Sequence, residues 1–223
     1  MVFGDRVAAA NSGAPAAWIR SACRGAEFTV GALVPNAYPS VLRVQAPPGS
    51  DRFWSSYREL FATIASVGER HTSSPDRAWF AIWEGHGFDS STRHIAHPGP
   101  LDDEARLQLE QERARLRAKD DRRNSSIRAE LTTVPRFTMP YRTYHLVTGP
   151  VSAVTHLRNP AEPDAWQRPE LFWPDDRRWF VATDVDFWSL YVGGEHEFIS
   201  DLVGAVATPS EVVTLDLALE PED

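Results

Sequence analysis

The alternation of apolar and polar residues divides the chain into helical and strand-like segments. The pattern predicts helices over residues 14–23, 51–68 and 195–207, where apolar side chains recur three and four positions apart or follow a helix-starting residue. Short apolar or alternating runs predict strands over 41–46, 78–85, 141–149, 177–187 and 211–219. Strand and helix do not alternate strictly, so we expect an α+β fold. Its sheet would be mixed or antiparallel, with about five strands packed by helices.

Residues 100–131 follow a different pattern, with many charges and few large apolar side chains. Eight acids and eight bases lie between positions 101 and 131. Pro100 and the acids that follow it favour a helix start, because proline fits the first turn and acids complement the helix dipole. A helix without an apolar stripe buries no face. We therefore expect an exposed charged helix, or a partly disordered insertion, within a single α+β domain spanning residues 1–223.

Composition narrows the class of protein. The chain has 223 residues, of which 42% are hydrophobic, and this is enough to bury a sizeable core. Cys23 is the only cysteine, which excludes an intrachain disulfide and a multi-cysteine metal site. The chain lacks an apolar run of ~18 residues and a convincing signal peptide. We expect a cytoplasmic protein that does not enter the membrane.

The net charge of −8 comes entirely from the last part of the chain. Residues 195–223 hold eight acids and no Lys or Arg, whereas the first 194 residues contain 23 acids and 23 bases. An acidic chain is a poor non-specific binder of nucleic acid. The segment is either a solvated helix face with a frayed tail or a surface for a basic protein partner. In the second case, Glu195, Glu197 and Asp201 are the candidate partner-binding residues.

Two acids lie inside one of the most apolar stretches, "RRWFVATDVDF". Residues two apart in a strand share a face, so the Asp184 and Asp186 carboxylates could hold a divalent cation or titrate as a pair. Alternatively, the strand ends there, and the acids accept backbone N–H groups in the following turn or pair with Arg177 or Arg178. The second alternative makes them structural.

Glu84 and His86 follow the other aromatic strand, in "AWFAIWEGH". Functional side chains often lie on loops directly after buried strands. If the ends of the two aromatic strands lie side by side around a pocket, Asp184, Asp186, Glu84 and His86 could serve a metal-dependent hydrolase. The chain contains no GxGxxG, Walker A, GxSxG or HExxH motif, and we expect no cofactor.

Two resemblances add expectations. The stretches 30–48, 79–87, 135–150 and 168–194 together resemble a family of uncharacterised proteins from high-GC bacteria, a resemblance that implies no catalytic residue. The stretch "LYVGGEHEFISDLVGAV" is similar to the closing strand-turn-helix of the SUKH superfamily, many members of which are immunity proteins against secreted toxins. The resulting hypothesis is a non-enzymatic protein-binding module, of the immunity type, that inhibits a basic toxin. The metal-dependent hydrolase is the alternative.

Overall fold

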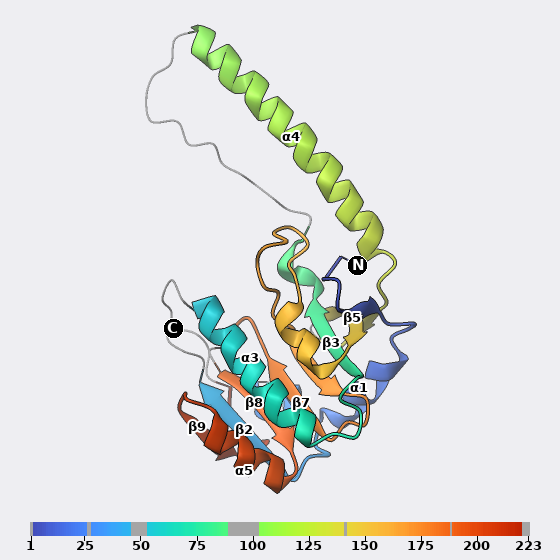
Figure 1. Cartoon of the computed structure of the whole chain (residues 1–223), viewed down its shortest axis with the longest axis vertical. Helices are drawn as coiled ribbons and strands as arrows, with labels where there is room; N and C mark the ends of the chain where they lie inside the picture. Colours follow the sequence, from blue (N-terminus) through green and yellow to red (C-terminus); the bar gives the residue numbers. More distant parts are fainter. Residues whose placement is uncertain are drawn as a thin grey trace.

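One antiparallel sheet organises the chain. The computed structural model describes residues 2–25, 28–45, 53–88, 103–140, 142–187 and 189–219. Its nine strands follow the order β1-β5-β3-β6-β7-β8-β2-β9, and β4 and β1 pair with different parts of the outer side of β5. Figure 1 labels β5, β3, β7, β8, β2 and β9 of this sheet. The strands are β1 (Ala8–Ala9), β2 (Ser40–Gln45), β3 (Ala78–Trp83), β4 (Arg136–Thr138), β5 (Thr143–Gly149), β6 (Leu171–Pro174), β7 (Trp179–Thr183), β8 (Ser189–Gly194) and β9 (Ser210–Val213).

The α+β class and an antiparallel sheet agree with the sequence prediction, but the prediction of about five strands is wrong. The sequence analysis missed β1, β4, β6 and β8. Two of these strands are only two or three residues long, which is too short to show alternation. Prolines around β6 and the two glycines that end β8 resemble loop signals, yet both strands lie in the middle of the sheet, where neighbouring ladders fix them.

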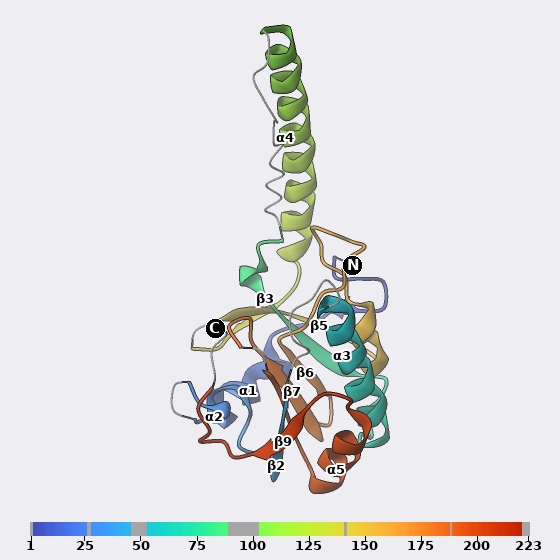
Figure 2. The ribbon, with the colours of Figure 1, turned by 90° about the vertical axis from the view of Figure 1, so that its left-hand side faces the viewer.

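Helices cover both faces of the sheet (Figure 2). On one face lie α3 (Phe53–Arg70), the 3-10 helix η3 (Val151–His156) and α5 (His196–Ala205). On the other lie the 3-10 helix η1 (Ala14–Ala16), α1 (Ala17–Ala22) and α2 (Val30–Leu33). Strands between two layers need apolar side chains at every position, which explains why β6 and β7 are buried throughout.

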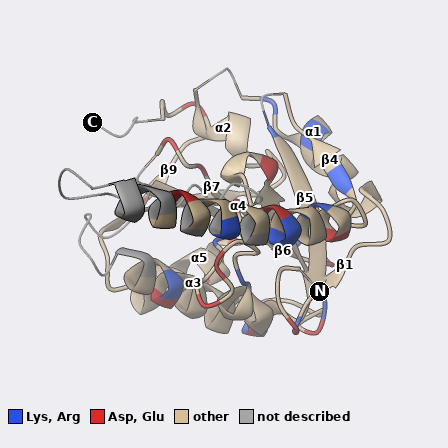
Figure 3. Cartoon of the chain, turned by 90° about the horizontal axis from the view of Figure 1, so that it is seen from above, with Lys and Arg blue, Asp and Glu red and all other residues tan. Residues whose placement is uncertain are grey.

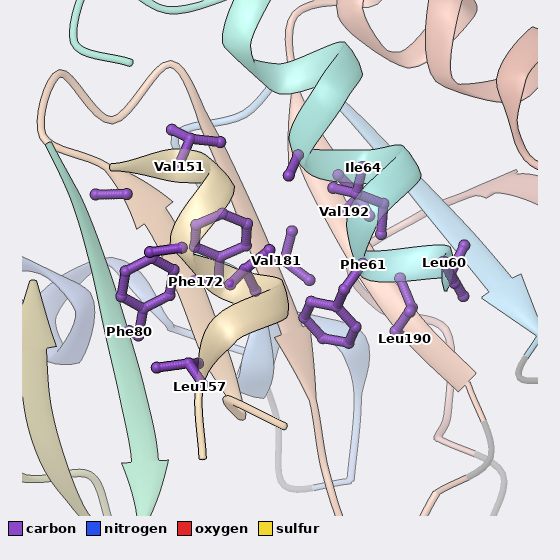
Figure 4. Close-up of a cluster of buried hydrophobic side chains, with 14 of the residues drawn as sticks. Leu60, Phe61, Ile64, Phe80, Val151, Leu157, Phe172, Val181, Leu190 and Val192 are labelled. Carbon is purple, nitrogen blue, oxygen red and sulfur yellow. The ribbon is translucent and has the colours of Figure 1, made fainter. Parts of the chain in front are cut away.

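The larger of the two cores lies beneath α3 and η3. Figure 4 shows side chains of β3, β6, β7 and β8 meeting those of the two helices in this layer. Phe80 and Phe172 stack with ring centroids 4.9 Å apart, and Trp179 meets Phe172 edge-on at 4.8 Å. Aromatic pairs of this kind add stability beyond the area they bury. These rings join β3, β6 and β7 on the face of the sheet that α3 and η3 cover.

The helix α4 (Asp103–Leu131) connects the 3-10 helix η2 (Glu84–His86) with β4 and projects away from the sheet (Figures 1 and 2). Among its described side chains, Ile127 is buried in the core, and Arg123 donates to the carbonyl of Ala161. Acidic and basic residues both occur along it (Figure 3). Residues 100–102 of the predicted segment lie outside the described residues, and its status as an insertion stays a prediction. None of the described helices combines the length and apolarity that crossing a membrane requires.

Gly68 is not the helix stop that the sequence suggested, because α3 continues to Arg70. The reason for a glycine is a close approach by β7. The Trp179 indole Nε1–H donates to the Gly68 carbonyl over 3.0 Å, and a Cβ on Gly68 would lie 2.6 Å from the indole ring. Only glycine lets α3 sit this close to the sheet.

We expect Gly68→Ala to lower the free energy of unfolding by about 1–3 kcal/mol, because either Trp179 or the helix must move. Gly204→Ala in α5 is the matched control. A Cβ there meets nothing within 4 Å, so alanine should stabilise the helix by about 0.5 kcal/mol. Urea unfolding of both variants measures the difference. A Gly68→Ala variant as stable as the parent would show that the packing of Trp179 is not tight.

Candidate functional site

The ends of the two aromatic strands lie at the same end of the sheet. Strands β3 and β7 are each antiparallel to β6, which lies between them, so they run in the same direction. Glu170, directly before β6, bridges the two ends: its N–H donates to Ala81 over 2.8 Å and its carbonyl accepts from Thr183 over 2.8 Å. The predicted juxtaposition therefore exists, but with β6 in between.

Arg142 holds both of the predicted aspartates. Its Nε donates to Asp184 Oδ2 over 2.8 Å, and its Nη2 lies 2.6 Å from both Asp184 Oδ1 and Asp186 Oδ2. The guanidinium also stacks over the Trp83 ring at 4.5 Å. Asp184 directly follows β7, and its Oδ1 accepts the backbone N–H of Asp186 over 2.9 Å. The carboxylate pair lies where β7 ends, and through Arg142 it ties the residue before β5 to this end of β7, across β3 and β6.

The two aspartates differ in burial and therefore in what they contribute. The side chain of Asp184 is 7% exposed, whereas that of Asp186 is 69% exposed. Burial acts to lower the pKa of Arg142, but the charges of Asp184 and Asp186 outweigh it and raise this pKa overall. The guanidinium thus stays charged, and Asp184 has a permanent counter-ion. Both oxygens of Asp184 are already hydrogen-bonded, so a metal would have to displace Arg142.

His86 pairs with Glu170, a residue that the sequence analysis did not select. Glu170 Oε1 lies 2.8 Å from His86 Nε2, and Oε2 accepts the Trp83 backbone N–H over 2.7 Å. The carboxylate is 1% exposed. A buried carboxylate needs such partners to remain in place. This pair fixes η2 to the start of β6, on the opposite face of the sheet from Arg142.

A second buried charge lies beside this carboxylate. The Arg168 guanidinium is within 3.7 Å of Glu170 Oε1 and lies 5.3 Å above the Tyr57 ring. The Tyr57 hydroxyl in turn lies 3.3 Å from Thr183 Oγ1. These groups connect α3 with the start of β6 and the end of β7. The cluster therefore fixes where α3 packs on this end of the sheet.

Glu84 lies apart from the aspartates, at the base of α4. Its Oε1 accepts from Arg136 Nη1 over 2.6 Å. Both residues line a hollow of about 360 Å³ together with Phe88, Arg128, Leu131, Thr132 and His145. His145 is buried there, and its Nδ1 has no hydrogen-bond partner. Burial lowers the pKa of His145, so the ring is neutral near pH 7.

The four residues of the predicted hydrolase are thus distributed among three arginine or carboxylate partners. Asp184 and Asp186 contact Arg142, Glu84 contacts Arg136, and His86 contacts Glu170. Across the described ranges, no group of three or more His, Cys, Asp or Glu side chains is arranged to hold a metal. Nothing in this geometry favours metal-dependent hydrolysis.

The predicted partner-binding acids lie at the opposite end of the sheet, with Glu195 directly before α5 and Glu197 and Asp201 on it. Glu195 and Glu197 are exposed at its start and form no ion pair with any described residue. Asp201 differs, because its Oδ2 lies 2.8 Å from His71 Nε2, just after α3. Asp201 therefore also holds α5 against α3. No pattern in the sequence indicates this pair, whose members are 130 positions apart.

The same region carries exposed apolar side chains that the sequence analysis missed. Val203 on α5, Val212 on β9 and Phe28 are the large hydrophobic residues left exposed among the described residues. Phe28 adjoins the segment after β9, because its carbonyl accepts the Leu219 N–H over 2.8 Å. We call α5, β9, residues 214–219 and Phe28 the C-terminal edge. In Figures 1 and 2, α5 and β9 lie side by side.

Comparison with protein-family models, curated proteins and solved structures gives no match to the chain. The two resemblances from the sequence therefore stay predictions, and function has to be argued from the residues themselves.

We expect Arg142→Gln to lower the free energy of unfolding by about 3 kcal/mol, because it leaves the buried Asp184 carboxylate without a counter-ion. Asp186→Asn removes an exposed member of the same group and should cost less than about 1 kcal/mol. Denaturant unfolding of both variants at neutral pH gives the comparison. Equal effects of the two substitutions would contradict a structural role for the Arg142–Asp184 pair.

His145 should make stability depend on pH. Its folded pKa lies below the ordinary value of 6.5, so above that pH both states are neutral and stability is complete. As pH falls below about 6.5, the unfolded state binds a proton that the folded state rejects, and stability declines. The His145→Phe variant should therefore become more stable relative to the parent as pH falls, which thermal unfolding between about pH 5 and 8 measures. A difference in melting temperature between variant and parent that stays constant across this pH range would exclude a contribution of His145 to the pH dependence.

Proposed function

We propose that the chain is a non-enzymatic protein-binding module that takes a basic protein partner on its C-terminal edge. One observation carries the proposal: two of the three exposed large hydrophobic side chains of the described residues, Val203 and Val212, belong to the segment that also holds the chain's excess of acids, and the third, Phe28, hydrogen-bonds through its carbonyl to the end of that segment. Single exposed apolar residues are ordinary on a protein surface. Their concentration in one acidic segment is what favours an interface, in which apolar contacts supply affinity and a charged rim supplies specificity.

The charge of this edge supports a basic partner. Five acids of the described part of the segment are exposed, and two of these contact a basic side chain: Glu211 forms an ion pair with Arg43, and Asp201 lies within hydrogen-bond distance of His71. Glu195, Glu197 and Asp216 form no ion pair with any described residue. A cluster of unneutralised carboxylates speeds association with a positively charged surface and disfavours acidic partners.

The most specific form of the proposal is an immunity-type protein in the cytoplasm that covers the basic surface of a toxin. A toxin that acts on nucleic acid needs a positive surface, since it must neutralise phosphates. An acidic edge with apolar side chains is complementary to such a surface. The strand-end charges described above leave no comparable support for catalysis, because each acid there already has a cationic or histidine partner.

Charge reversal tests this proposal. A tagged chain is used to capture partners from its host at low salt, and the captured protein is then purified and titrated. We expect a stoichiometric basic protein whose affinity falls at least about ten-fold at high salt and in the Glu195→Lys/Glu197→Lys variant. Neither side chain forms a hydrogen bond or ion pair with a described residue, so we expect the variant to fold, with a loss of about 1 kcal/mol because two acids at the start of α5 no longer complement the helix dipole.

The matched control is Glu162→Lys/Asp164→Lys, which makes the same charge change at exposed positions in the loop after η3. It should bind as the parent does, apart from the small effect of net charge. An acidic partner, or equal affinity in the α5 variant and the parent, would overturn the proposal.

A further inference from the structure

Strand β9 is the last strand of the sheet and has a free side. It pairs with β2 through four residue pairs, from Val44–Ser210 to Val41–Val213. No other described strand lies beyond it. Edge strands expose backbone donors and acceptors that can pair with another chain. What such an edge can bind depends on which of its backbone groups point outward.

One hydrogen bond fixes the outward groups. Gln45 N–H donates to the Pro209 carbonyl over 3.0 Å, so the backbone of residue 209 points toward β2. Backbone direction alternates along a strand, and the register with β2 contains no slip. Glu211 and Val213 therefore face β2, whereas Ser210 and Val212 direct their N–H and C=O groups away from the sheet.

The side chains of the edge alternate as well. Val212 lies opposite Leu42, on the face that α5 covers, and is 64% exposed. Glu211 lies opposite Arg43 on the other face and pairs with it. A strand added to this edge would meet an apolar side chain on one face and a carboxylate on the other.

We propose that an extended segment of the basic partner adds as a strand to β9, hydrogen-bonding to Ser210 and Val212. This inference rests on the proposed function and specifies how the partner binds. The segment would place apolar residues on the Val212 face and Lys or Arg on the Glu211 face, because the charge of the edge calls for them. A second copy of this chain fits poorly, since pairing two β9 edges brings two acidic segments together.

Amide exchange measured by NMR tests the free and the bound edge residue by residue. In the free chain, the amides of Ser210 and Val212 should exchange fast, whereas those of Glu211 and Val213 are protected by β2. A synthetic peptide alternating Lys and Val is the probe. At saturation it should slow exchange at Ser210 and Val212 at least ten-fold, and a peptide alternating Glu and Val should not. Protection of Ser210 and Val212 in the free chain, or no change with the lysine peptide, would overturn the inference.

A backbone substitution separates this inference from the charge proposal. Val212→Pro removes an outward N–H but no bond to β2, so the sheet should persist. Val212→Ala keeps the N–H and controls for the side chain. We expect at least ten-fold weaker partner binding for the proline variant and less than three-fold for alanine.

The outcomes are distinguishable. If Val212→Pro binds as the alanine control does while Glu195→Lys/Glu197→Lys loses the partner, strand addition is wrong and the acidic surface stands. If the Glu195→Lys/Glu197→Lys variant also binds the partner as the parent does, both strand addition and the proposed function are wrong. Should the proline variant fail to fold, the exchange measurement on the parent chain still decides.

Discussion

Burial of the sheet on both faces is the constraint on which the rest of the structure depends. Helices cover each side, so the central strands can carry almost no polar side chain along their length. In β3, β6 and β7, charged groups are therefore confined to the strand ends, where backbone and side-chain partners can satisfy them. Arg142 with Asp184, and Glu170 with His86, are the two cases at one end of the sheet. These two pairs cover the core at this end of the sheet, and the interior itself stays apolar.

The same constraint explains how far the sequence could predict the fold. Long apolar strands such as β3 and β7 were evident because two-sided burial makes nearly every residue hydrophobic. Strand β6 was hidden between prolines, and β8 ends in two glycines, so local signals favoured loops where the neighbouring ladders impose strands. Gly68 was interpreted as a helix end for a similar reason. Its role depends on Trp179, which no pattern within α3 reveals.

The candidate sites were predictable only in part. The acids after β7 and the acidic C-terminal segment are visible in the sequence, but their partners are not. Arg142 is 42 positions from Asp184, and Glu170 is 84 positions from His86. The exposure of Val212 on an edge strand could not be predicted either, because it depends on β9 being the last strand of the sheet. The structure thus separates carboxylates that complete the fold from those that face solvent without a partner.

That separation underlies the proposed function. Several acids with partners hold strands and helices together, whereas Glu195, Glu197 and Asp216 form no ion pair with a described residue and lie with exposed apolar groups on the C-terminal edge. The most direct measurement is hydrogen exchange by mass spectrometry over the whole chain, free and in complex with its purified partner. The account predicts protection concentrated in residues 195–219, with the strand-end cluster around Glu170 and the helix α4 unchanged. Protection at that cluster or along α4, with the C-terminal edge still exchanging freely, would contradict it.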